Sequence, residues 1–148
     1  MTERAETFDA IILGAGAAGL MCALTAGQRG RRVLLLEHTD KVGAKILISG
    51  GGRCNFTNLE AGPKRFISDN PHFCVSALKR FTQHDFIARV DARGIAWHEK
   101  TLGQLFCDGS AKEIIGMLLD DLRGVGGELR LGVEPVAIRR TADGFEVE

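Results

Sequence analysis

Residues Phe8–Glu37 read FDAIILGAGAAGLMCALTAGQRGRRVLLLE, and this stretch decides the fold. The apolar run Ala10–Leu13 predicts a strand, and the run Gly14–Gly19, GAGAAG, follows it directly. A helix is expected after these glycines, and the apolar run Arg32–Leu36 predicts a second strand. A strand, a glycine-rich turn, a helix and a second strand are the components of a βαβ unit that binds a dinucleotide.

The three glycines of the motif are predicted to have separate roles. Gly14 permits a tight turn, Gly16 lets the backbone approach a pyrophosphate, and Gly19 lets the helix pack closely on the sheet. The first N–H groups of the helix and the positive end of its dipole then point at the phosphates. The residues expected to contact the cofactor in this turn are Gly14, Ala15, Gly16, Ala17, Ala18 and Gly19.

The second strand is followed directly by an acid. Glu37 stands eighteen residues after Gly19, near the roughly 20-residue spacing that places a carboxylate on a ribose hydroxyl. The full spacing, GxGxxGxxxAxxxxxxGxxVxxxE, resembles the FAD-binding form of the motif more than the NAD form. A carboxylate there also argues against NADP, whose 2′-phosphate is accommodated by arginine. His38 is expected either at the adenosine end of the cofactor or as a solvated loop residue.

A second glycine-rich stretch lies at Lys45–Asn58, KILISGGGRCNFTN. Consecutive glycines lose much entropy on ordering, so this stretch predicts an irregular loop that brings backbone N–H groups against a ligand. A flexible surface turn is the alternative. Cys54 is the cysteine whose pKa the neighbouring Arg53 could lower. The cofactor-binding residues expected here are Lys45, Ser49, Gly50, Gly51, Gly52, Arg53, Cys54 and Asn55.

Together, Gly14–Gly19, Glu37 and the run GAKILISGGGRCNFTN at Gly43–Asn58 resemble the HI0933-like flavoproteins, a family that includes aminoacetone oxidase-type enzymes. The later stretch Gly103–Ser110, GQLFCDGS, is similar to that family's GRxFPxS segment, with Cys107 where proline is usual. The resemblance runs from about Phe8 to Glu148.

This resemblance implies non-covalent FAD, a Rossmann-like domain and an oxidoreductase activity. It also implies that residues 1–148 are the N-terminal part of a longer FAD-binding domain, incomplete at its C-terminus and inactive by itself, with a substrate domain further along the chain. In related folds the strand near Pro135 and Val136 lends backbone to the adenine, although proline has no N–H group to donate.

The rest of the chain predicts alternating short elements. Met1–Thr7 is expected to fray. Helices are expected from Asn70-Pro71 to Arg80, from a capping box at Thr82 and Asp85 to Gly94, and from a capping box at Ser110 and Glu113. Strands are expected at Ile95–Glu99, Gln104–Cys107, Glu128–Leu131, Pro135–Arg139 and Phe145–Val147, with no third strand returning to the first βαβ unit. Trp97 is interpreted as a core residue or, alternatively, as a wall beside the flavin.

Composition limits the partners that the sequence suggests. The 148 residues carry 19 basic and 19 acidic side chains, and no basic arm suggests nucleic acid or a membrane surface. The four cysteines form no CxxC pair and no metal-binding pattern, and Cys22, Cys74 and Cys107 are expected to be small core residues. The uncharged run Ala10–Gly27 contains glycines and lacks a basic flank, so a cytoplasmic protein is expected.

The sequence therefore predicts an α/β fold, a Rossmann-like FAD-binding domain with an added small β-layer. The expected function is that of an oxidoreductase whose flavin accepts a hydride from NAD(P)H or a small organic substrate. No histidine lies in a catalytic pattern, so the catalytic residues stay open. The oligomeric state also stays open. An NAD-dependent dehydrogenase, a tRNA-modifying flavoprotein and a non-enzymatic FAD-binding sensor are the alternatives.

Overall fold

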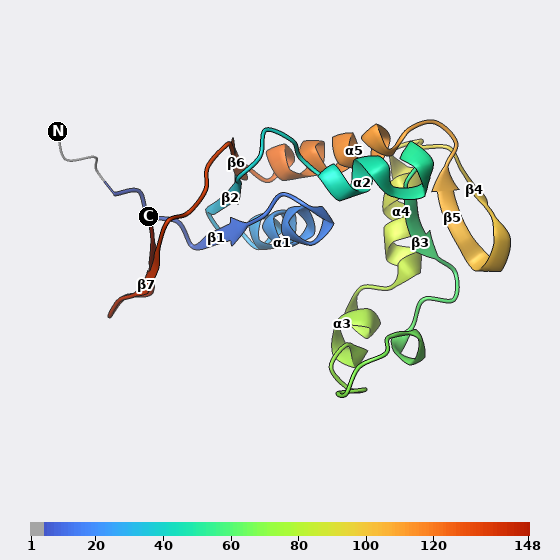
Figure 1. Cartoon of the computed structure of the whole chain (residues 1–148), viewed down its shortest axis with the longest axis horizontal. Coiled ribbons are helices and arrows are strands. Elements are labelled where there is room, and N and C mark those ends of the chain that lie inside the picture. Colours follow the sequence, from blue (N-terminus) through green and yellow to red (C-terminus); the bar gives the residue numbers. More distant parts are fainter. Residues whose placement is uncertain (1–4) are drawn as a thin grey trace. The chain divides into compact units, whose positions relative to one another are not determined.

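The computed structural model describes residues 5–148, and these divide into two compact units. The first unit contains residues 5–44 and 118–148, and the second contains Lys45–Met117. The chain therefore leaves the first unit, forms the whole of the second, and returns to complete the first (Figure 1).

A three-stranded parallel sheet forms the centre of the first unit. Its order is β1-β2-β6, with β1 at Ala10–Leu13, β2 at Val33–Glu37 and β6 at Glu128–Leu131. The central strand β2 is buried at all five positions, because it is paired along both edges and its side chains are apolar up to the terminal acid. Helix α1, Ala17–Gln28, connects β1 to β2 and buries Leu20, Ala23 and Leu24.

The expectation that no third strand returns to the first βαβ unit is wrong. Strand β6 pairs in parallel with β2, with Leu34 opposite Glu128 and Glu37 opposite Leu131. The sequence ELRL alternates acid, apolar, base and apolar, which is the pattern of a half-exposed strand and not of a buried parallel one. Strand β6 lies at the edge of the sheet, and 90 residues separate it from Glu37 in the chain. Its place at the edge accounts for that pattern.

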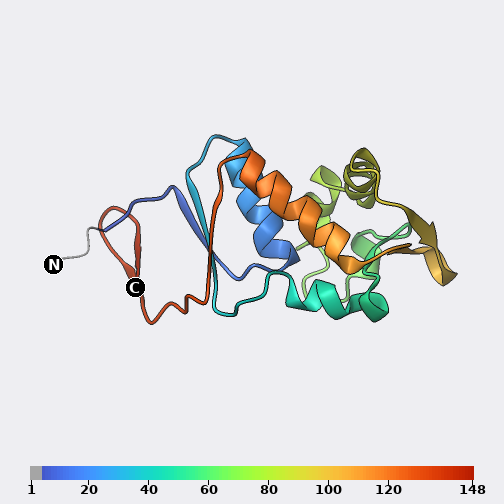
Figure 2. The same cartoon turned by 90° about the horizontal axis from the view of Figure 1, so that it is seen from above.

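The segments around β6 follow the sequence more closely. Helix α5, Ala111–Gly124, starts where the capping box predicts, since Ser110 N donates to Glu113 Oε2 at 2.9 Å. The chain directly after α5 packs tightly on the end of α1, because a Cβ at Gly27 would lie 2.4 Å from Val125 Cγ2 (Figure 2). A hairpin of β7, Ile138–Arg140, and β8, Phe145–Val147, follows β6. Strand β7 thus begins three residues after the expected Pro135.

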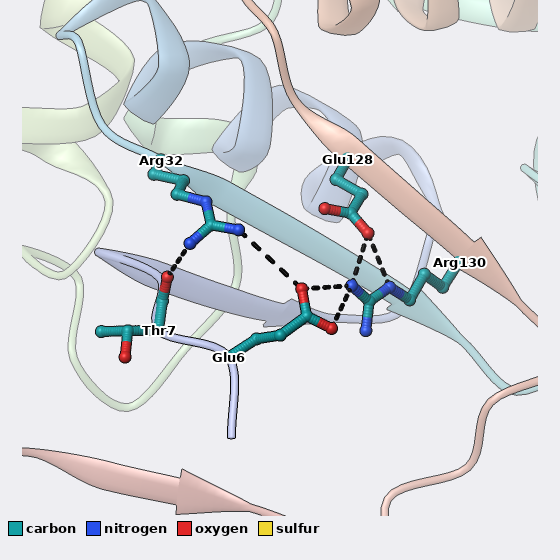
Figure 3. Close-up of polar contacts among 5 residues, drawn as sticks. All are labelled: Glu6, Thr7, Arg32, Glu128 and Arg130. Atoms are coloured by element: carbon teal, nitrogen blue, oxygen red, sulfur yellow. Dashed lines mark hydrogen bonds and ion pairs between the residues drawn. The ribbon is translucent and has the colours of Figure 1, made fainter. Parts of the chain in front are cut away.

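Charged side chains anchor the N-terminal arm to the sheet (Figure 3). Glu6 lies between two arginines, with Arg130 Nη2 at 2.8 Å from its Oε1 and Arg32 Nη2 at 3.8 Å from its Oε2. Arg32 Nη1 also donates to Thr7 O, and Glu128 accepts from Arg130 Nε at 2.7 Å. The expected fraying is therefore wrong for Glu6 and Thr7, while Met1–Arg4 lie outside the described residues. Because these ions are exposed, the ion pairs position the arm more than they stabilise the fold.

The second unit contains an antiparallel sheet, which is the predicted added β-layer. Its order is β3-β5-β4, with β3 at Asn55–Asn58, β5 at Gln104–Cys107 and β4 at Trp97–Glu99. Strands β4 and β5 form the predicted hairpin around the turn η3, Thr101–Gly103. The remaining helical elements are α2 (Ala44–Ile48), η1 (Ser49–Gly52), η2 (Pro63–Arg65), α3 (Val75–Arg80) and α4 (Gln83–Ala92).

Two helix starts differ in how well the sequence located them. The capping box of α4 is confirmed, since Thr82 Oγ1 accepts from Asp85 N and Asp85 Oδ2 accepts from Thr82 N at 2.7 Å. Helix α3 begins only at Val75, because Asn70 closes a turn instead, with its Oδ1 accepting from His72 N at 3.2 Å.

Trp97 belongs to the packing of the second unit. Its ring lies edge-on to Phe56, with centroids 6.2 Å apart, and its Nε1 donates to Asp91 Oδ1 at 2.7 Å. A half-buried indole with its one donor satisfied fits the core interpretation. Among residues 5–148, no helix combines the length and the apolar character needed to cross a membrane.

Candidate functional site: two glycine-rich segments

The turn between β1 and α1 has the backbone that the motif predicts. Gly14 has φ +96°, which favours glycine, and its N–H donates to Leu36 O at 2.7 Å across the sheet. A Cβ at Gly19 would lie 1.8 Å from Gly14 O, so α1 can approach the turn this closely only with glycine there. A Cβ at Gly16 would meet no atom within 4 Å, so the protein itself leaves that position open. Space that the fold does not fill is what a bound pyrophosphate requires.

The first turn of α1 has donors that no side chain satisfies. Gly16 is the N-cap, and it provides no side-chain hydrogen bond to the helix. The first turn contains no acid, and Gly16, Ala17 and Ala18 are exposed. Free N–H groups at the positive end of a twelve-residue helix suit an anionic group.

Glu37 lies at the carboxyl end of β2 and is held by backbone donors. Its Oε2 accepts from Ala15 N at 2.9 Å, so the acid is tied directly to the glycine turn. Its Oε1 accepts from Thr39 N at 3.0 Å and Thr39 Oγ1 at 2.9 Å, and His38 Nδ1 lies 3.0 Å away. The hydrogen bonds from Thr39 N and then Ala15 N lower the pKa of Glu37 against the opposing effect of burial, so the side chain is a carboxylate at neutral pH.

This arrangement limits how Glu37 can contact a ribose. A carboxylate has about four lone-pair positions, two on each oxygen. Oε1 already has three polar neighbours, whereas Oε2 has only Ala15 N among the described contacts. Oε2 therefore keeps an acceptor position for one sugar hydroxyl, and the site fits the ribose of a dinucleotide.

A cavity of about 520 Å³ lies beside His38, the residue that follows Glu37 in the chain. It is lined by Leu13, His38 and the segment 134–138, so the structure brings Pro135 and Val136 next to His38. Pro135 has no N–H, and Val136 N donates to Glu148 O at 2.6 Å. The cavity thus offers an apolar wall to a flat ring at these two positions, and no free backbone N–H.

The second glycine-rich segment is more regular than the expected loop. Residues 44–58 form α2, η1 and β3 in succession, so the prediction of an irregular loop over Lys45–Asn58 is wrong. Gly50, Gly51 and Gly52 have φ of +57°, +66° and +87°, and these left-handed residues turn the chain from α2 into β3. Ser49 Oγ donates to Ile46 O at 2.8 Å, which ends α2. Glycine's conformational freedom is what allows a turn this tight between two regular elements.

The other predicted residues of this segment are divided between surface and interior. Lys45, Gly51, Arg53 and Asn55 are exposed, whereas Cys54 is buried with only 5% of its surface accessible. Burial raises the pKa of the Cys54 thiol, although a hydrogen bond with Ser49 partly opposes this effect. The expectation that Arg53 lowers this pKa is therefore wrong, because desolvation of the thiolate dominates.

The other cysteines follow the core expectation in part. Cys107 is fully buried, as expected, and burial raises its pKa to about 12. Cys74 is half-buried, and Cys22 is exposed on α1, so the core interpretation is wrong for Cys22.

The structure groups the predicted site residues in two sets. Gly14–Gly19, Glu37, His38, Pro135 and Val136 belong to the first unit. Lys45 and Ser49–Asn55 belong to the second. All residues of each set therefore lie within a single unit.

One polar pair was missed by the sequence analysis. His98 Nδ1 lies 2.6 Å from Asp108 Oδ1, and its ring stacks on Phe106. The two residues are adjacent because β4 pairs with β5, and the predicted hairpin register was the only signal that could have found them.

Comparison with known proteins identifies the family. The model of the HI0933-like protein Rossmann domain matches residues 8–148. The chain belongs to the HI0933-like family. It is 57% identical over 143 residues to a protein of Escherichia coli (strain K12) named ribosomal RNA dihydrouridine synthase, covering 97% of this chain and 36% of that protein. A protein of Haemophilus influenzae with the same name is 49% identical over 130 residues, covering 88% of this chain and 32% of that one.

These matches confirm the family and leave the aminoacetone oxidase type unsupported, since both relatives have another name. The chain spans about a third of the length of the curated relatives that it matches. Among solved structures, it is similar to a 3-ketosteroid dehydrogenase from Rhodococcus jostii RHA1, with a TM-score of 0.67 and 14% identity over 99% of this chain and 43% of that one.

The fold and cofactor predictions are confirmed at the level of the HI0933-like family. The chain is an α/β Rossmann domain of the FAD-binding type. FAD is therefore the cofactor, in preference to the NAD of the alternative dehydrogenase interpretation.

Proposed function

We propose that this chain is the cofactor-binding part of an FAD-dependent reductase that acts on a uridine of ribosomal RNA. The observation that carries the proposal is the 57% identity to a ribosomal RNA dihydrouridine synthase over 97% of the chain. At that coverage the aligned region includes most of both glycine-rich segments. The geometry of the first unit supports the cofactor half, because the open position at Gly16 and the free acceptor on Glu37 fit a dinucleotide.

The reaction needs one hydride and one proton for each uridine. Dihydrouridine is uridine with its C5=C6 double bond reduced, so a hydride is added to one carbon and a proton to the other. When bound, FAD supplies the redox chemistry that moves a hydride from NAD(P)H, which leaves as NAD(P)⁺. The proton comes from water or from a protein acid.

The residues of this chain bind and orient in that scheme. The first turn of α1 would hold the pyrophosphate with its backbone N–H groups, which offset negative charge without a lysine or arginine. Glu37 Oε2 accepts from a ribose hydroxyl, while Ala15 N and Thr39 N keep the carboxylate ionised and oriented. Contacts at these two points would orient the cofactor relative to the protein.

This proposal reverses the expectation that no nucleic acid is bound. That expectation was based on the formal neutrality of the whole chain, with 19 basic and 19 acidic residues, and on the absence of a basic arm or patch in the sequence. Neutral composition does not exclude a local basic surface, because binding depends on how charge is distributed. We retain NAD(P)H as the reductant and a cytoplasmic location, where ribosomal RNA is found.

The test is genetic and chemical. Deleting the gene that encodes this chain should remove dihydrouridine from ribosomal RNA of the source organism, as measured by mass spectrometry of digested RNA. Expression of the intact protein should restore the modified base. Glu37→Arg should fail to restore it, whereas Asp143→Arg, a change at an exposed turn residue, should restore it.

Unchanged dihydrouridine in the deletion strain would refute the substrate. The runner-up is then the reduction of a small organic substrate, which NAD(P)H oxidation by the flavin-loaded protein in the presence of candidate compounds would detect.

A further inference from the structure

The second unit contains an exposed excursion whose side chains have no place in its core. The chain leaves β3 at Leu59 and returns at Gln83, the first residue of α4, where Gln83 Nε2 donates to Leu59 O at 2.8 Å. We call residues 60–82, between these two ends, the excursion; it contains η2 and α3 (Figure 1). None of residues 60–82, all of which the structure describes, is buried.

The excursion exposes large apolar side chains, most of them aromatic. The exposed fractions are 50% for Phe66, 102% for Ile67, 82% for Phe73 and 39% for Phe81. Single exposed apolar residues are ordinary, but four within 16 residues of sequence are unusual for a surface with no other role.

Each of the three aromatic rings directly follows a basic residue in the sequence. The pairs are Arg65-Phe66, His72-Phe73 and Arg80-Phe81, at nearly even spacing. Lys64 and Lys79 add further positive charge, while Glu60 and Asp69 are the acids of the excursion. Glu60 is paired with Arg65, so Lys64, Lys79 and Arg80 stay without a carboxylate partner within the described part of the chain.

Local hydrogen bonds hold the backbone of the excursion in place. Ser68 Oγ accepts from Asn70 N at 3.0 Å, and Phe73 N donates to Asn70 O at 3.1 Å. Arg65 N donates to Gly62 O at 2.9 Å at the start of η2. The rings are thus presented from an ordered backbone, which reduces the entropy lost when a ligand binds.

We propose that the excursion binds unpaired RNA, an inference that rests on the proposed function. Unpaired bases stack on aromatic rings regardless of sequence, and neighbouring cations neutralise the phosphates between them. An apolar protein partner fits less well, because lysine is depleted from protein interfaces, and Lys64 and Lys79 each lie two residues before an exposed ring in the sequence.

The test measures binding of the 148-residue chain to fluorescein-labelled oligouridine by fluorescence anisotropy. Phe66→Ala combined with Phe73→Ala should weaken binding by at least tenfold, since each stacked base contributes about 1–3 kcal/mol. Lys79→Ala combined with Arg80→Ala should lower the slope of log K against log salt by about 1.4, because each phosphate contact on a single strand contributes about 0.7.

Matched controls come from exposed residues of the first unit. Phe145→Ala removes an aromatic ring that is 71% exposed, and Arg29→Ala with Arg31→Ala removes two exposed cations. Neither control should change the affinity by more than about twofold, which is less than the effect of one stacked base. Neither should change the slope of log K against log salt by more than about 0.3, which is less than the effect of one phosphate contact. All of these side chains are exposed, so thermal unfolding should stay as in the unchanged chain.

Three results would overturn the proposal: no binding of oligouridine by the unchanged chain, equal binding by the excursion variants, or equal losses in the controls. Self-association that Phe73→Ala abolishes, without an effect on RNA, would instead assign the surface to a second copy of the chain. If the anisotropy measurement shows no RNA binding, the result of the gene deletion for dihydrouridine still stands. If the gene deletion leaves dihydrouridine unchanged, the anisotropy result still stands.

Discussion

At Gly19 in the first glycine-rich segment the protein's own packing requires glycine, whereas at Gly50–Gly52 in the second the backbone conformation requires it. A Cβ at Gly19 would lie 1.8 Å from a carbonyl oxygen, although the φ of Gly19 is not in the left-handed region. All three glycines of the second segment have positive φ, yet a Cβ at Gly51 would meet no atom within 4 Å. Gly50 combines both constraints, because a Cβ there would lie 2.6 Å from Phe106 Cε1.

The difference shows that glycine can be required at a position for different structural reasons, even when the sequences look alike. Steric contact with backbone cannot be relieved by a side chain that moves, so it produces a large cost on substitution. Positive φ produces a smaller cost, which asparagine partly avoids. Substitution of an open glycine with an ordinary φ, such as Gly16, should change the stability of the fold little. At such a position an effect on ligand binding can be measured without an effect on folding.

The largest effect is expected for Gly19→Ala. Its Cβ must displace Gly14 O and α1 together, so we expect a loss of at least about 4 kcal/mol in the free energy of unfolding. Urea titration followed by circular dichroism measures it. Gly16→Ala is the matched control, with a change in unfolding free energy within about 0.5 kcal/mol but weaker FAD binding. Equal stability of the two variants would contradict the assigned packing.

In the second segment, Gly50→Ala and Gly51→Ala should differ. Gly51→Ala should lose about 1–2 kcal/mol of unfolding free energy, from left-handed strain alone. Gly50→Ala should lose about 1–3 kcal/mol more, because its Cβ also meets Phe106 and lies 2.9 Å from Asn55 N. Gly51→Asn should recover part of the loss, since asparagine tolerates positive φ. The same denaturant titration tests all three, and identical midpoints for both alanine variants would show that Phe106 moves aside.

Glu37→Arg should weaken FAD binding by more than tenfold, about 1.4 kcal/mol, because the charge-assisted bond that we propose between Glu37 and the ribose would be lost. Glu37→Gln keeps the shape and isolates the charge. Flavin fluorescence titration measures both variants. Unchanged affinity in the arginine variant would remove Glu37 from the cofactor site.

The same residue also predicts a pH dependence of stability. Folding lowers the pKa of Glu37 below its ordinary value of 4.5, so its contribution is present above that value and lost as pH falls through the folded-state pKa. The acid limb of the stability profile should therefore be shallower for Glu37→Gln. A limb that stays equally steep would assign acid unfolding to other carboxylates.

The smallest effect is expected at the thiols. Burial keeps Cys54 protonated, so Cys22 on the surface of α1 should react first with a thiol reagent at neutral pH, and Cys22→Ser should remove that fast phase. Cys54→Ser should retain full dihydrouridine formation in the complemented strain, because a neutral buried thiol is no nucleophile. Rapid labelling of Cys54 at neutral pH would contradict its burial.

Cys107 gives an alkaline counterpart to the Glu37 profile. Its pKa is raised from 9.0 to about 12, so the unfolded chain releases this proton first and stability falls as pH rises above 9.0. Cys107→Ala should flatten this alkaline limb when stability is measured across that range.

The parts that the sequence predicted well depend on residues close together in the chain. The capping boxes at Thr82 and Ser110 were located because each involves a side chain and a backbone group three residues apart. The turn at Gly14 and the acid at Glu37 belong to one βαβ unit whose spacing follows from strand and helix geometry.

Other features were missed because distant residues decide them. The predicted loop at Lys45–Asn58 became η1 and β3 because β5, far along the chain, supplies a partner strand for Asn55–Asn58. Cys54 was expected beside a favourable charge, but burial within the second unit raises its pKa. His98 and Asp108 meet only through the register of β4 and β5.

The sequence by itself determined the βαβ cradle, its acid and the choice of FAD over NADP, because these depend on local spacing and on the charge of one side chain. Only the tertiary structure decided that β6 is the third parallel strand, that Oε2 of Glu37 accepts from Ala15 N, and that residues 60–82 expose their aromatic rings. The reason is physical: strand pairing, burial and the satisfaction of hydrogen bonds depend on neighbours that are close in space and far apart in the chain.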